Sequence, residues 1–201
     1  SSSSSDESEN ELEDELEELG HTLEEIKAME QNICSAIDSA SSGNVNSKKL
    51  AVQKRFVKFL RNKAKEKGPA LLITRHSGVD SIVAAIRSFP TSLELLIDSF
   101  ATLSDICYYN KGTYRLDLEI YPDILKIMKR YSKAKASSNA KLHFHAICTM
   151  QHLGIKRSLK HKMIADGCVE QVVESMRLYK SNVDVQDAAC LCIQDLAREP
   201  Q

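Results

Sequence analysis

The chain has 201 residues, a formal net charge of −1 at pH 7 and 42% hydrophobic residues. This length leaves room for one elongated domain and a tail, and the apolar fraction can fill a narrow core. No stretch approaches the roughly 20 apolar residues that a membrane span requires, and no cleavable signal pattern opens the chain, which argues against integral membrane and secreted proteins. We therefore expect a cytoplasmic protein, with the nucleus as the alternative location. Because the sequence starts at Ser1 without a methionine and stops at Pro200-Gln201, we also expect it to be a fragment of a longer protein.

The cysteines support an intracellular protein. They include no C-x-x-C pair, and most fall on or beside apolar helix faces, which is typical of small, reduced core residues. The six cysteines are Cys34, Cys107, Cys148, Cys168, Cys190 and Cys192.

The small net charge conceals a strong segregation of charge in the first third of the chain. Residues 1–30 carry twelve acids against the single base Lys27, whereas residues 48–67 carry nine bases against the single acid Glu66. Such blocks are typical of solvated faces or mobile tails. Residues 1–11 contain mostly serine and acidic residues, and we expect this tail to be disordered because it cannot bury apolar surface.

Residues 12–47 are expected to form amphipathic capping helices followed by a loop. Their apolar residues recur at steps of four and three, which is a heptad-like spacing. Gly20 interrupts the pattern and barely four heptads are present, so helices that cap the open end of a repeat array are favoured over self-association through residues 12–37. The Ser-, Gly- and Asn-rich stretch 39–47 is predicted to be a loop.

A basic helix is predicted next, over about residues 48–65. Val52, Phe56 and Leu60 recur at i, i+4 and i+8, as in the last helix of a degenerate repeat. The strip of bases on this helix is a candidate site for nucleic acid or anionic lipid, although its phenylalanines are expected to face the core and the pI near 6.6 argues against a dedicated binder of this kind. The candidate residues of this basic strip are Lys48, Lys49, Lys54, Arg55, Lys58 and Arg61.

Three units with a shared apolar signature follow, at about 66–107, 111–154 and 156–197. The signature of the middle helix is Ile82-Val83-x-x-Ile86-x-x-Phe89 in the first unit, and it recurs from Ile124 and from Val172. A longer helix follows in each unit, with apolar residues at i, i+8 and i+11. The i+4 position is always small, being Ser99, Ala146 or Ala189, as a close helix crossing requires.

The last unit resembles a complete armadillo repeat. The resemblance lies in Ile-Ala-Asp-Gly-Cys-Val-Glu-Gln-Val-Val at 164–173 and Val-Gln-Asp-Ala-Ala-Cys-Leu-Cys-Ile-Gln-Asp-Leu-Ala at 185–197. It implies an all-α fold over residues 48–201: a right-handed α-solenoid of three-helix repeats whose third helices line a groove for extended peptides or other proteins. Nuclear-import receptors of the family use a Trp-x-x-x-Asn ladder there, and this chain has no tryptophan, so reading of import signals is not expected.

The predicted third helices carry polar residues beside their buried faces. Stacked repeats would set an acidic, a basic and an acidic stripe side by side, which would suit protein binding; the competing interpretation is ordinary solvated positions. The candidate partner-binding residues are Glu94, Asp98 and Asp105 in the first unit, Lys141, His145 and His152 in the second, and Asp184 and Asp195 in the third. The two histidines are expected to gain charge toward pH 6 and to strengthen binding of an acidic ligand.

No catalytic, metal or cofactor site is indicated. His145 and His152 lie two turns apart on one helix, too far to share a metal ion, and there is no Gly-rich phosphate loop, G-x-S-x-G or H-E-x-x-H motif. The sequence thus predicts a non-enzymatic scaffold that binds another protein or an extended peptide through its third helices, with the acidic N-terminal segment as a regulatory or competing ligand.

Overall fold

The protein is all-helical in the part that the structure describes. The computed structural model describes residues 16, 19–20, 22–41, 46–110, 120–132, 137–155 and 157–198. Their helices are α2 (Leu23–Ser41), α3 (Asn46–Lys63), α4 (Lys67–Arg75), α5 (Gly78–Ser88), α6 (Leu93–Tyr109), α7 (Tyr121–Tyr131), α8 (Ser137–Leu153), α9 (Arg157–Ala165), α10 (Cys168–Leu178) and α11 (Val183–Ala197). The predicted disordered tail at 1–11 lies outside the described residues.

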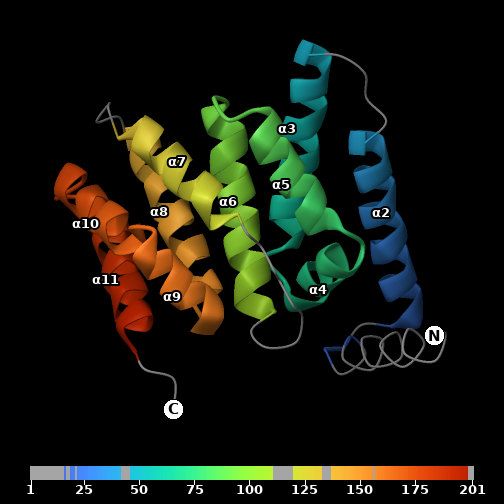
Figure 1. The fold of residues 1–201 in the computed structure, drawn as a ribbon. Helices are drawn as coiled ribbons and strands as arrows, with labels where there is room; N and C mark the ends of the chain where they lie inside the picture. The colour runs from blue at the N-terminus through green and yellow to red at the C-terminus, as the bar shows by residue number, and fades with distance from the viewer. Residues whose placement is uncertain are drawn as a thin grey trace.

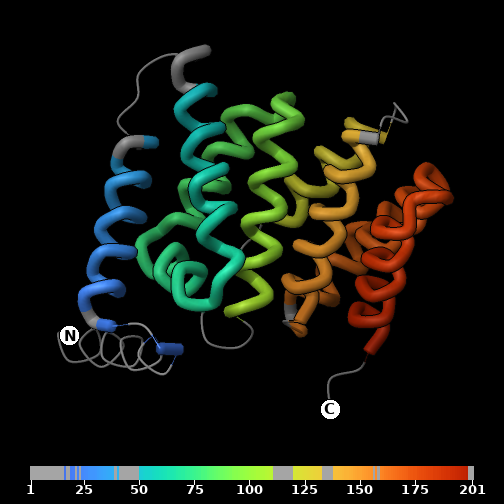
Figure 2. The backbone as a smooth tube through the Cα atoms, turned by 180° about the vertical axis from the view of Figure 1, so that it is seen from behind, coloured from blue at the N-terminus to red at the C-terminus, as the bar shows by residue number. Residues whose placement is uncertain are grey.

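Four long helices form a row. Helix α3 packs on α6, α6 packs on α8, and α8 packs on α11, and Figure 2 shows these four side by side in chain order. Helices α4, α5, α7, α9 and α10 lie on the other side of the row, where Figure 1 shows them in front. Helix α2 stands beside this arrangement at its N-terminal end.

Helix lengths recur along the chain. Helices α4, α5 and α6 have 9, 11 and 17 residues, and α9, α10 and α11 have 9, 11 and 15. Between them, α7 and α8 have 11 and 17 residues, and the segment before α7, at 111–119, lies outside the described part. The order of a short, a medium and a long helix thus occurs in α4–α6 and again in α9–α11.

The small residues predicted at close helix crossings are buried. Ser99 of α6, Ala146 of α8 and Ala189 of α11 are all fully buried. Between α6 and α8, which pack on each other, the hydroxyl oxygen of Thr149 lies 2.9 Å from the backbone carbonyl oxygen of Phe100. A side chain larger than alanine at Ala146 or Ala189 would therefore have no free volume to occupy.

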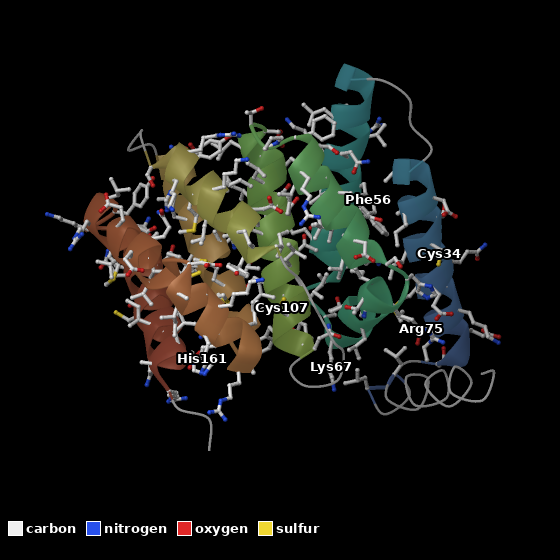
Figure 3. The ribbon with its side chains drawn as sticks, viewed as in Figure 1. Cys34, Phe56, Lys67, Arg75, Cys107 and His161 are labelled. Atoms are coloured by element: carbon white, nitrogen blue, oxygen red, sulfur yellow. The ribbon has the colours of Figure 1, made fainter. Side chains whose placement is uncertain are left out.

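Helix α2 covers one end of the row. It packs against α3, α4 and α5, and its Ile26 and Ile33 are each only 1% exposed. Its Glu30 carboxylate also lies 3.6 Å from the guanidinium of Arg75 on α4, which Figure 3 shows between the two helices. Ile26 and Ile33, two residues of the stripe considered for self-association, are thus buried against the rest of the chain, whereas Leu19 is 43% exposed.

One local prediction needs correction, and one turn has an unusual backbone. The loop expected at 39–47 is shorter, because Ala40 is buried and its carbonyl accepts a hydrogen bond from Gln53 Nε2 at 2.9 Å, so α2 continues to Ser41. At the turn before α5, Ser77 rather than Gly78 has the left-handed backbone, with φ 58°. A Cβ on Gly78 would lie 2.6 Å from Cγ2 and 2.8 Å from the carbonyl oxygen of Ile73, so this glycine permits close approach of α4 and α5.

No helix formed by the described residues is both long enough and apolar enough to cross a lipid bilayer.

Candidate protein-binding groove

A groove of about 610 Å³ lies across the row of long helices. Helix α3 contributes one lining residue, α6 and α8 contribute four each, and α11 contributes one. The lining residues are Arg61, Leu93, Glu94, Ile97, Asp98, Ser138, Lys141, Phe144, His145 and Asp184. Five of the eight predicted partner-binding residues therefore line one groove, together with Arg61 of the basic strip.

The apolar part of the groove lies between α6 and α8. Leu93, Ile97 and Phe144 are partly buried and pack against the core. Their residual exposure gives the groove an apolar surface that a ligand side chain could cover. These three residues are not among the predicted partner-binding residues. A signal was present, because Ile97 and Phe144 each come two residues after a fully buried leucine of their helix, Leu95 and Leu142 respectively.

The acidic stripe of α6 is paired with the basic strip of α3. Lys54 Nζ lies 2.7 Å from Glu94 Oε2, and Arg61 forms an ion pair with Asp98. The hydrogen bond from Lys54, together with its positive charge, holds the pKa of the Glu94 carboxyl below its usual range. The predicted acidic stripe of α6 and the predicted basic strip of α3 therefore neutralise part of each other's charge.

Lys141 and Asp184 are the exposed charges of the groove that remain uncompensated. Lys141 lies on α8 and Asp184 on the neighbouring α11, and both are exposed. Within the described part of the chain neither makes an ion pair, with the other or with a third residue. These two side chains can accept charged groups from a ligand without breaking an internal contact.

The remaining predicted residues lie further along the same helices and do not line the groove. Asp105 is half-buried, and burial raises the pKa of its carboxyl although Arg61 and Lys65 oppose the shift. His152 Nδ1 lies 3.1 Å from the carbonyl oxygen of Ser104 on α6. Asp195 accepts a hydrogen bond from Gln151 Nε2 of α8 at 2.8 Å. His152 and Asp195 thus take part in contacts between neighbouring long helices, and Asp105 interacts electrostatically with Arg61 of α3.

The expectation that His145 gains charge toward pH 6 is wrong. Burial lowers the pKa of His145 to about 4, and the positive charges of Arg61 and Lys141 lower it further, whereas Asp98 alone opposes them. His145 is therefore neutral at pH 6. The sequence placed it correctly on the groove but could not reveal how much solvent its neighbours exclude.

The basic strip is only partly free for an external ligand. Lys54 and Arg61 are held in the ion pairs with α6, while Arg55 and Lys58 are exposed. The side chains of Lys48 and Lys49 lie outside the described residues. Phe56 is buried and Phe59 packs partly buried against the core, so these aromatic rings cannot stack on bases.

The thiols of Cys107 and Cys148 are poor nucleophiles. All six cysteines are free thiols, and Figure 3 shows Cys34 on α2 and Cys107 on α6. Burial raises the pKa of Cys107 to about 12 and that of Cys148 to about 11, so both are protonated at neutral pH.

Among the residues that the structure describes, no three His, Cys, Asp or Glu side chains are close enough together to hold a metal ion.

The chain matches no protein-family model, no curated protein and no solved structure. A functional proposal must therefore rest on the residues and geometry of this chain.

Proposed function

We propose that this protein is a non-enzymatic scaffold, an α-solenoid of armadillo-like repeats, that binds another protein through an extended segment lying in the groove across α3, α6, α8 and α11. The recurrence of helix lengths and the row of long helices support a repeat architecture. The buried small residues at corresponding positions of α6, α8 and α11 support it further.

One observation carries the functional part of the proposal: a single groove receives side chains from four successive long helices. Its partly buried Leu93, Ile97 and Phe144 can contribute affinity through apolar contact, and its charged residues can fix the position of a ligand. A surface assembled from four helices suits a ligand that crosses all of them, such as an extended peptide.

A random 12-residue peptide display library, selected on the purified protein, tests the proposal. The variant Ser138→Trp places a large side chain at an exposed lining position of α8 and should abolish binding of the selected peptides. The matched control is Ser88→Trp, at an exposed serine of α5 that does not line the groove. If no peptide is enriched, or if the enriched peptides bind Ser138→Trp as tightly as the wild type, the proposal is wrong.

Salt dependence distinguishes this function from binding of nucleic acid or anionic lipid through the basic strip. Binding to phosphates weakens steeply as salt rises, because each neutralised phosphate releases counterions. A contact anchored on the apolar part of the groove depends much less on salt. Fluorescence anisotropy of a selected peptide and of a single-stranded oligonucleotide, titrated at low and high salt, separates the two.

A further inference from the structure

We propose that the groove selects an extended segment in which an apolar, an acidic and a basic side chain follow one another across α6, α8 and α11. The apolar side chain lies on Leu93, Ile97 and Phe144, the acidic one pairs with Lys141, and the basic one pairs with Asp184. This inference rests on the proposed function and adds the chemistry of the partner.

The order follows from the positions of the groove residues in the row. Leu93 and Ile97 come from α6, Phe144 and Lys141 from α8, and Asp184 from α11. Because α8 packs between α6 and α11, a segment that crosses the row meets the apolar surface first, then the cation and then the anion. The N-to-C direction of the segment can be either way along this line.

The charges follow from which ion pairs are already formed. Glu94 and Asp98 have cationic partners on α3, so the α6 side of the groove presents little net charge to a ligand. His145 beside Lys141 is neutral, since burial lowers its pKa to about 4. Lys141 therefore attracts an acidic group without a second cation beside it on α8, and Asp184 attracts a basic group.

The spacing follows from helix packing. Axes of packed helices lie about 8–10 Å apart. An extended segment in the polyproline II conformation advances about 3.1 Å per residue with three residues per turn, so acidic and basic residues about three apart span this distance on one face of the segment. A polyanion does not fit this pattern. Asp184, the acid of the groove without a cationic partner, would repel one of its successive phosphates.

Selection of the same display library on charge variants tests the proposal. Peptides enriched on the wild type, and blocked by Ser138→Trp, should contain an acidic and a basic residue about three apart, with the apolar residue on the acidic side. Lys141→Glu should enrich a basic residue in place of the acidic one. Asp184→Lys should enrich an acidic residue in place of the basic one. Both positions are exposed, so each variant should retain the circular dichroism of the wild type.

Affinity for one selected peptide supplies the quantitative test. Lys141→Glu should weaken it about tenfold, and reversing the acidic residue of the peptide should restore most of the loss. The controls are Lys129→Glu on α7 and Glu174→Lys on α10, exposed charges outside the groove, which should leave the affinity unchanged.

The outcomes separate the two proposals. If Ser138→Trp blocks the selected peptides but they show no acidic and basic pair, or if Lys141→Glu and Asp184→Lys leave the selected sequences unchanged, the groove binds peptides without this charge order and the present inference is wrong. If no selected peptide is sensitive to Ser138→Trp, the proposed function itself fails.

Discussion

Lys54 Nζ lies 2.7 Å from Glu94 Oε2, so the basic helix α3 is joined directly to the acidic side of α6. A second ion pair, between Arg61 and Asp98, connects the same helices further along. Both ion pairs accompany the packing of α3 on α6 in the row of long helices. They also leave Lys141 and Asp184 as the exposed charges of the groove that a ligand can pair with.

Double-mutant cycles should find the second of these ion pairs stronger than the first. The side chains of Lys54 and Glu94 are 36% and 66% exposed, so their coupling free energy should be about 0.2–1 kcal/mol and should decrease in high salt. Asp98 is only 13% exposed, and Asp98→Asn should cost about 1.5–3 kcal/mol, as for a hydrogen bond to a charged group. Urea denaturation measures both. A stronger coupling at Lys54 and Glu94 would contradict the burial of these groups.

Ala189→Leu should destabilise the protein by roughly 1–3 kcal/mol, because Ala189 is fully buried where α11 packs on α8 and extra methyl groups would overpack the crossing. The exposed Ala197 on the same helix is the matched control, and Ala197→Leu should change the stability little. Thermal melting followed by circular dichroism provides the measurement. Equal melting temperatures for Ala189→Leu and the wild type would mean that the helix register is wrong.

Gly78 and its neighbour Ser77 should respond oppositely to substitution. Gly78→Ala should destabilise by roughly 1–3 kcal/mol, because the added Cβ would lie 2.8 Å from the backbone oxygen of Ile73. Ser77→Gly should stabilise by about 0.5–1 kcal/mol, since glycine adopts φ 58° without steric strain. The free energy of unfolding in urea decides both. Stabilisation by Gly78→Ala would show that α4 and α5 do not approach closely.

Acid should weaken the fold through His143. This side chain is fully buried between α8 and α10, with Nδ1 2.8 Å from Ser175 Oγ, and burial lowers its pKa from 6.5 to about 4. The unfolded state therefore binds more protons than the folded state between these values, so stability is complete above pH 6.5 and decreases as the pH falls toward 4. The loss attributable to His143 between pH 7.5 and pH 5 should be about 2 kcal/mol.

Variants of the histidines test this pH dependence. His143→Leu should make the unfolding free energy less dependent on pH, because it removes the titrating imidazole. The Ser175 hydroxyl keeps a hydrogen bond in this variant, since it donates to the carbonyl of Gln171 at 2.9 Å. His161→Gln, at an exposed position on α9, is the control for substituting a histidine outside the core. An unchanged pH dependence in His143→Leu would show that His143 is not buried in its neutral form.

Binding in the groove should not depend on protonation of His145. Since its pKa is about 4, His145→Gln should leave the pH profile of peptide affinity unchanged between pH 6 and pH 8. Isothermal titration calorimetry of a selected peptide across this range makes the comparison. If peptide affinity rises toward pH 6 in the wild type but not in His145→Gln, His145 does gain charge in this range and the prediction is wrong.

Helix α3 shows which structural features the spacing of apolar residues can predict and which it cannot. The i, i+4, i+8 spacing of Val52, Phe56 and Leu60 predicts a helix with an apolar face, and Phe56 and Leu60 are buried as expected. Periodicity could not reveal which helix covers that face. Nor could it reveal that Lys54 forms an ion pair with Glu94, or Arg61 with Asp98. The two ion pairs join residues 40 and 37 positions apart, and only the packing of α3 on α6 determines such separations.

The sequence by itself determined the apolar faces of the helices, the small residues at their crossings and the polar positions beside them, because each of these depends on the helical repeat within a single segment. Only the tertiary structure decided which charges are compensated, how deeply His145 is buried and that Leu93, Ile97 and Phe144 form an apolar surface between α6 and α8. These properties depend on distances and solvent exclusion between helices far apart in the chain, which no local pattern of residues encodes.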